Sequence, residues 1–267
     1  SEIQEKQLTT LEGNITALEI DGTFDDCQKL VKSAFVDSDL TDKRNLTSAN
    51  SINIARLIPQ SFYYFEGYKQ LTDKNADVVF SVPSGNLGNL TAGLFANEMG
   101  LNVDKFIAGT NSNRVFAEYI QSGSFNPVKS VRTLSNAMDV GNPSNLARIR
   151  ALYNDEIENI RKVIFSDTFS DEQTVEAIKK VHNQTGYLLD PHGAVGYLAL
   201  KDYLKHHPGK TGIVLETAHP AKFTDILEGE AGITPEMPER LKACLDKSKK
   251  SIKLPGSYDD FKEYLLS

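Results

Sequence analysis

The sequence predicts an α/β protein built on a parallel sheet. Short apolar runs alternate with stretches of helical periodicity along its 267 residues. Two of these runs end in polar turns that contain glycine, and no internal repeat or low-complexity tract breaks the alternation. Ligands of parallel sheets usually lie beyond the carboxyl ends of the strands, so both polar turns are expected at one rim.

Apolar periodicity places the elements in order. The first is a β-turn-α unit, in which Asp21-Gly22-Thr23 separates a strand from an amphipathic helix. In the next helical stretch, Pro59 should kink the helix or mark a boundary within it. Strands are expected at 14–20, 78–82, 105–108 and 212–215, and helices at 24–35, 51–71, 89–99, 144–152, 156–165, 171–185 and 193–206.

Three segments lack such periodicity. Residues 37–50 are polar and are expected to cross between two lobes. Residues 125–143 are rich in Asn, Ser and Thr, so ordered irregular structure near the rim is expected there. The carboxyl end is expected to form a helical cap with turns at Pro235, Pro238 and Pro255.

Composition limits the possible partners. The net charge is −7 and no basic run is sustained, which argues against a nucleic-acid or membrane surface and favours a small-molecule partner. No apolar stretch approaches the ~20 residues of a membrane span, and the first residues do not resemble a signal peptide. Cys27 and Cys244 fall at apolar helical positions and are interpreted as reduced core residues of a cytoplasmic protein.

The most informative segment is Ser81-Val-Pro-Ser-Gly-Asn-Leu-Gly-Asn-Leu-Thr91. An apolar run enters a turn with Gly85 and Gly88 and leaves as a helix, whose first N–H groups can bind an anion. The P-loop lysine and the Gly-x-Gly-x-x-Gly spacing do not occur in it. The segment therefore predicts a site for a small phosphorylated cofactor or substrate, with a purely structural turn as the alternative.

Eight motifs in this order resemble the carboxyl-terminal part of the threonine synthases, which are pyridoxal-phosphate enzymes of the tryptophan-synthase-β-like fold. The resemblance extends from about Glu5 to the end of the chain. The matching segments are 46–56, 83–89, Ala92-Gly-Leu-Phe-Ala-Asn-Glu-Met-Gly100, 110–113, Thr133-Leu-Ser-Asn-Ala-Met-Asp139, 143–145, Asp190-Pro-His192 and Thr217-Ala-His-Pro-Ala-Lys-Phe223.

This resemblance implies a three-layer, parallel-sheet large domain at 50–267 with the helical cap, and a remnant of the smaller domain at 1–49. Members of the family also carry an amino-terminal Phe-Lys-Asp motif, whose lysine forms the Schiff base, and a Ser-Gly-Asp-Thr-Gly loop. Neither motif occurs here. The chain is therefore expected to be an inactive fragment without a catalytic residue of its own, and its partner is the missing amino-terminal portion.

The family reaction converts O-phospho-L-homoserine and water into L-threonine and phosphate with pyridoxal 5′-phosphate. By resemblance, Thr217 faces the pyridine nitrogen of the cofactor, and its alternative role is that of a turn or helix-cap residue. The residues that match the loop around the cofactor phosphate are Gly85, Asn86, Leu87, Gly88 and Asn89. A non-catalytic phosphate-binding fragment and a related dehydratase are the alternative functions.

Other polar residues are weaker candidates for catalysis or substrate binding. His219 is interpreted as a turn residue before a proline rather than as a catalytic residue. His192 is interpreted as a packed residue at a helix start that Asp190 caps, with catalysis as the alternative. Lys222 matches a family position other than the Schiff-base lysine. Four further residues are candidates for substrate binding or loop stabilisation, with an Asx-turn or N-cap role as the alternative, namely Asn111, Asn113, Ser144 and Asn145.

Overall fold

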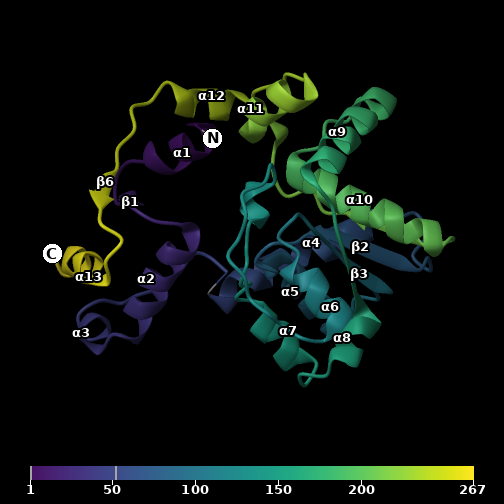
Figure 1. Ribbon diagram of the computed structural model, residues 1–267, viewed down its shortest axis with the longest axis horizontal. Coiled ribbons are helices and arrows are strands. Elements are labelled where there is room, and N and C mark those ends of the chain that lie inside the picture. The colour runs from purple at the N-terminus through teal and green to yellow at the C-terminus, as the bar shows by residue number, and fades with distance from the viewer. Residues whose placement is uncertain (1, 52) are drawn as a thin grey trace. The chain divides into compact units, whose positions relative to one another are not determined.

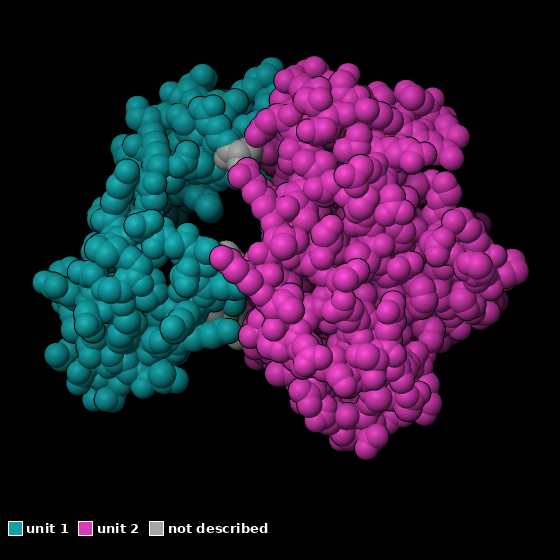
Figure 2. Space-filling model, viewed as in Figure 1, with its two compact units in different colours: residues 1–48, 236–267 teal, residues 49–235 magenta. Residues whose placement is uncertain are grey.

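The computed structural model describes residues 2–51 and 53–267. The chain forms two compact units (Figure 2): residues 49–235 make up the larger one, and residues 1–48 together with 236–267 make up the smaller one. Each unit has its own sheet. None of the described helices is long and apolar enough to cross a membrane.

The larger unit contains a four-stranded parallel sheet in the order β4-β3-β2-β5, of which Figure 1 labels β2 and β3. Its strands are β2 (Val78–Pro83), β3 (Lys105–Thr110), β4 (Ile164–Thr168) and β5 (Thr211–Val214). Every ladder is parallel, with Phe80 of β2 opposite Phe106 of β3 and Ile213 of β5. The predicted α/β class and parallel sheet are confirmed.

Helices cover both faces of this sheet. The helices of this unit are α4 (Leu57–Lys69), α5 (Gly88–Glu98), α6 (Val115–Ser122), α7 (Leu146–Leu152), α8 (Ile157–Val163), α9 (Asp171–Thr185), α10 (Pro191–His206) and the short α11 (Thr224–Ile226). Successive residues of β2 point to opposite faces. Phe80 packs in one core with Tyr64 of α4, whereas Val79 packs in another with Val195 of α10. The three-layer arrangement follows from these two cores.

Several boundaries differ from those expected. The helix expected at 156–165 ends at Val163, and Ile164 begins β4 because it pairs with Phe106. Pro59 does not kink α4, since it is the third residue of the helix, where a backbone N–H has no intrahelical acceptor. Helix α6 was not expected. The segment 125–143 is irregular, as predicted, apart from one turn of 3₁₀ helix at Asn136–Met138.

The smaller unit is built on a two-stranded parallel ladder between β1 (Leu18–Ile20) and β6 (Ile252–Leu254). Its helices are α1 (Glu2–Thr9), α2 (Phe24–Val36), α3 (Ser38–Thr41), α12 (Glu239–Leu245) and α13 (Tyr258–Leu266). Lys262 bridges Asp37 at 2.8 Å, which is the largest cause of the lowered pKa of Asp37, about 2. Both cysteines are free, but they are half-buried and lie outside the core.

This grouping differs from the expected division of the chain at its carboxyl end. Residues 236–267 associate with residues 1–48 because β6 pairs with β1 and α12 packs on α1. They thus belong to a different unit from residues 49–235. The interpretation of 1–49 as a remnant of a smaller domain stays a prediction.

Candidate functional site

The loop between β2 and α5 lies at the carboxyl edge of the four-stranded sheet. Its last residue, Leu87, has a φ of 60°, and α5 begins at Gly88. The backbone amides of Gly85, Asn86 and Leu87 donate no hydrogen bond to another described residue. Together with the first amides of α5, they form a row of donors at a helix N-terminus. Such a row is suited to an anion.

Gly85 is required by a close backbone contact. A Cβ atom at this position would lie 2.6 Å from the Cα atom of Met138. The segment that carries Met138 therefore presses directly on the loop, and an L side chain at position 85 would displace one or the other. At Gly88 the nearest atom to an added Cβ atom would be the Cβ atom of Ser51 at 3.3 Å, a contact that a small shift can relieve.

The side chain of Asn86 fastens the loop to the start of α7. Its Oδ1 atom accepts hydrogen bonds from the backbone amide of Ser144 at 2.6 Å and the hydroxyl of Ser144 at 3.0 Å. Its Nδ2 atom donates to the hydroxyl of Ser51 at 2.8 Å. Asn145 donates to the backbone carbonyl of Asn86. Asn86 thus uses its side chain to order the loop, and Ser144 and Asn145 act as loop-stabilising residues.

Asn89 is held by the core of the unit. The hydroxyl of Tyr64 donates to the backbone carbonyl of Asn89 at 2.7 Å and lies 3.0 Å from its side-chain Oδ1. Tyr64 is fully buried, and burial raises its pKa well above the ordinary value. Tyr64 therefore fixes the first turn of α5 to the core, while the first backbone N–H groups of the helix point away from it.

Thr217 lies just beyond the end of β5, the strand that pairs with β2. It is exposed, and its hydroxyl makes no hydrogen bond to another described residue. The cap of the following 3₁₀ turn is His219, whose Nδ1 accepts from the amide of Ala221 at 3.2 Å. The alternative role of Thr217 as the cap is thus taken by His219, which agrees with the structural interpretation of that histidine.

His192 is also structural. Asp190 caps α10 by accepting from the amides of His192 at 2.9 Å and Gly193 at 3.4 Å. The Nδ1 atom of His192 lies 2.7 Å from Oδ1 of Asp190, and the amide of Ala137 donates to Nε2 at 3.1 Å. The imidazole therefore connects α10 to the segment that presses on Gly85. The predicted cap and the packed histidine are confirmed.

Asn111 and Asn113 belong to a buried network around Asp139. Both side-chain amides donate to Oδ1 of Asp139, at 2.9 and 3.0 Å. The hydroxyl of Thr133 donates to the same atom at 2.7 Å, and its amide donates to Oδ2 at 3.0 Å. Of the two roles considered for the asparagines, the network favours the structural one. It orders residues 131–139 beneath the rim.

Glu216, which precedes Thr217, was not singled out from the sequence. Burial is the main cause that raises its pKa to about 8, and the carboxylate of Asp190 adds to the shift. Its Oε1 accepts from the amide of Asp190 at 3.4 Å. No residue pattern indicated that this glutamate is buried; its place directly after an apolar strand was the only signal.

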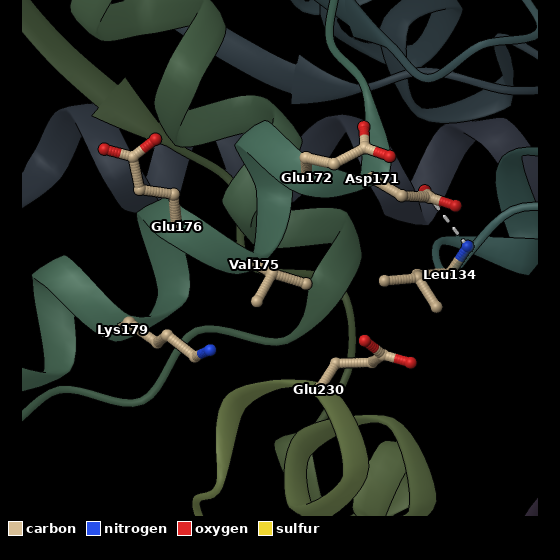
Figure 3. Close-up of a pocket in the computed structure, with 7 residues that line it drawn as sticks. All are labelled: Leu134, Asp171, Glu172, Val175, Glu176, Lys179 and Glu230. Carbon is tan, nitrogen blue, oxygen red and sulfur yellow. Dashed lines mark hydrogen bonds between the residues drawn. The ribbon is translucent and has the colours of Figure 1, made fainter.

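A pocket of about 530 Å³ lies elsewhere, beside α9 (Figure 3). Its lining includes four carboxylates and one lysine, and burial raises the pKa of Asp171, whose Oδ1 accepts from the amide of Leu134. The residues around it are Leu134, Asp171, Glu172, Val175, Glu176, Lys179 and Glu230. Such an acidic lining disfavours a phosphate. Among the described residues no cluster has the composition of a metal site.

Two family models match the chain. The pyridoxal-phosphate dependent enzyme model matches residues 1–216, and the threonine synthase C-terminal model matches residues 193–265. Threonine synthase from Haemophilus influenzae is 44% identical over 267 residues, which are 100% of this chain and 62% of that protein. The enzyme from Escherichia coli is 41% identical over 268 residues and is covered to 62%.

Solved structures agree with these matches. The crystal structure of threonine synthase from Escherichia coli superposes with a TM-score of 0.93 at 42% identity, covering 100% of this chain and 61% of that one. A structure of threonine synthase from Brucella melitensis with bound pyridoxal phosphate gives 0.88 at 31% identity, covering 99% and 62%. The chain thus spans less than two thirds of the length of these relatives.

Proposed function

The chain belongs to the pyridoxal-phosphate dependent enzymes, on the threonine synthase branch, and from this premise we propose that it provides the cofactor-phosphate and ring-nitrogen contacts of a threonine synthase. The proposed reaction of the whole enzyme converts O-phospho-L-homoserine and water into L-threonine and phosphate. When bound, pyridoxal 5′-phosphate supplies an electron sink for bonds broken at substrate carbon atoms. The chain's own residues bind and orient it.

The observation that carries this proposal is the row of amides at residues 85–87, which have no protein acceptor among the described residues and lead directly into α5. A phosphate dianion accepts from several N–H groups at once and is stabilised by the helix N-terminus. The close contact at Gly85 and the bonds to the Asn86 side chain hold the loop in place before binding. A prearranged loop loses little conformational entropy when the anion binds.

Thr217 is proposed to contact the pyridine nitrogen. Its unpaired, exposed hydroxyl at the end of β5, next to β2, supports this role. A hydroxyl can donate to an unprotonated ring nitrogen, whereas a carboxylate would favour protonation of that nitrogen. Thr217 would therefore leave the ring nitrogen unprotonated, so that the cofactor withdraws electrons less strongly than a protonated ring would. This suits a reaction in which the γ-phosphate must leave.

The proposal assigns the Schiff base with the cofactor to a lysine outside this chain. The proposed partner is therefore an amino-terminal portion of the same enzyme; the relatives are longer than this chain, which spans 62% and 61% of two of them. The proposed compartment is the cytoplasm, with which the two free cysteines are compatible. Lys222 occupies the 3₁₀ turn after Thr217 and is not proposed to bond to the cofactor.

An activity assay tests this proposal. The 267-residue chain alone, mixed with O-phospho-L-homoserine and pyridoxal phosphate, should release no phosphate above background. The same chain joined to the amino-terminal portion of a threonine synthase should form L-threonine. Release of phosphate by the chain alone would assign the covalent role to a lysine present here, Lys222 first, and a Lys222→Arg variant would then decide it.

A further inference from the structure

Glu216 occupies a space that α10 leaves for it. A Cβ atom on Gly193 would lie 1.6 Å from Oε2 of Glu216, so only glycine at that position admits the carboxyl group. The Oε2 atom is buried and has no hydrogen-bond partner among the described residues. An unpaired carboxylate oxygen in this position would be strongly destabilising.

The nearest charged group is a second carboxyl. Asp190 is 0% exposed, and its oxygens already accept from the amides of His192 and Gly193. Its Oδ1 also lies 2.7 Å from Nδ1 of His192. These donors stabilise an ionised Asp190. Since Nε2 of His192 accepts from the amide of Ala137, the imidazole is neutral and adds no positive charge to the pair.

Two carboxylates side by side in a buried site cannot both be ionised at low cost. Because Asp190 has the donors, the proton belongs on Glu216, where it makes the hydrogen bond between the Glu216 and Asp190 side chains possible. Burial and the Asp190 charge raise the pKa of Glu216 to about 8. Tyr187 also interacts with Glu216, but it is exposed and carries no charge at neutral pH.

We propose that Glu216 is a protonated carboxylic acid whose hydrogen bond to Asp190 positions the adjacent Thr217. The bond joins the segment after β5 to the start of α10, and Asp190 and His192 continue the connection to Ala137. Fixing the side chain of one residue fixes the backbone of its neighbour, so Thr217 is held at the rim. That Thr217 contacts the cofactor rests on the proposed function; the protonation of Glu216 does not.

The experiment is a pH titration of the 267-residue chain, labelled with ¹³C in its glutamate side chains, by nuclear magnetic resonance. The carboxyl resonance of Glu216 is expected to titrate near pH 8. The amide resonance of Thr217 should follow the Glu216 titration. Titration of Glu216 at the ordinary pKa of a glutamate would overturn the proposal. So would a Thr217 amide resonance that does not change as Glu216 titrates.

Variants distinguish the positioning of Thr217 from the protonation of Glu216. Glu216→Gln keeps a donor toward Asp190 and should leave the Thr217 amide as in the wild-type chain at pH 7, without the response near pH 8. Glu216→Leu lacks the donor and should shift that amide at every pH, and Glu228→Gln should change neither. If the titration behaves as expected but pyridoxal phosphate perturbs no residue of the rim, the proposed function fails while this inference stands.

Discussion

The side-chain amide of Asn145 donates a hydrogen bond to the backbone carbonyl of Asn86 across 2.8 Å. Asn145 is fully buried, so no solvent replaces this donor. The bond attaches α7 to the loop that follows β2, and the segment with Met138 contacts the same loop at Gly85. The row of amides proposed to bind phosphate is therefore held by two segments that come later in the chain.

Asn145→Ala should loosen the loop and destabilise the chain. It leaves the Asn86 carbonyl without its donor, at a cost of about 1–3 kcal/mol in the free energy of unfolding. Ser144→Ala is the matched control, because it removes one hydroxyl contact and keeps the backbone bond to Asn86 Oδ1. Urea denaturation and amide exchange at residues 85–87 measure both effects. Equal losses in the two variants would argue against the Asn145 bond.

Gly85→Ala and Gly88→Ala should affect different properties. The first forces backbone atoms apart at Met138 and should cost about 1–3 kcal/mol of folding stability. The second should fold within about 1 kcal/mol of the wild-type chain, because its contact with Ser51 is mild and alanine suits a helix start. Its added methyl group should nevertheless weaken binding of pyridoxal phosphate. Denaturation and fluorescence titration check the two expectations, and unchanged affinity of Gly88→Ala would remove that residue from the phosphate site.

Asp139→Asn should destabilise the segment beneath the rim. The carboxylate accepts from Asn111, Asn113 and Thr133, and an amide nitrogen in place of one oxygen would face a donor. The expected loss is about 2–4 kcal/mol, because the network is buried. Asp225→Asn is the control at an exposed site of the same unit. A loss at position 139 no larger than at position 225 would contradict the assigned network.

Stability should depend on pH through Glu216. Between its ordinary pKa of 4.5 and its folded pKa of about 8, the folded chain keeps a proton that the unfolded chain has released. The stability contributed by this group is therefore fully present below pH 4.5 and is lost as the pH rises toward 8, by at most about 1.4 kcal/mol per pH unit. The difference in unfolding free energy between wild type and Glu216→Gln should fall over this window. A difference independent of pH would show that Glu216 is not protonated.

The sequence predicted those parts of the fold that depend on local pattern. Helix α9 begins and ends where expected, at Asp171 and Thr185, because Ser170 forms a capping box and Gly186 follows in the left-handed conformation. The loop at 85–89 was identified because its glycines and the strand before it are adjacent in the chain. The N-cap of α10 was predicted for the same reason, because Asp190 directly precedes that helix in the sequence.

Other parts depend on contacts that a single sequence does not reveal. Strand β4 follows α8 without a turn residue, and only pairing with β3 decides where the helix ends. The grouping of residues 236–267 with 1–48 depends on pairing between segments at opposite ends of the chain. The protonated state of Glu216 requires the position of Asp190, which lies 26 residues earlier.

The central claim, that this chain binds the cofactor phosphate at the start of α5, is tested most directly by adding pyridoxal phosphate to the ¹⁵N-labelled chain and following its amide resonances. The account predicts that the amides of Gly85, Asn86, Leu87, Gly88 and Asn89 shift together, that Thr217 shifts with them, and that Gly88→Ala weakens the response. Shifts confined to other residues, or a full response in Gly88→Ala, would contradict it.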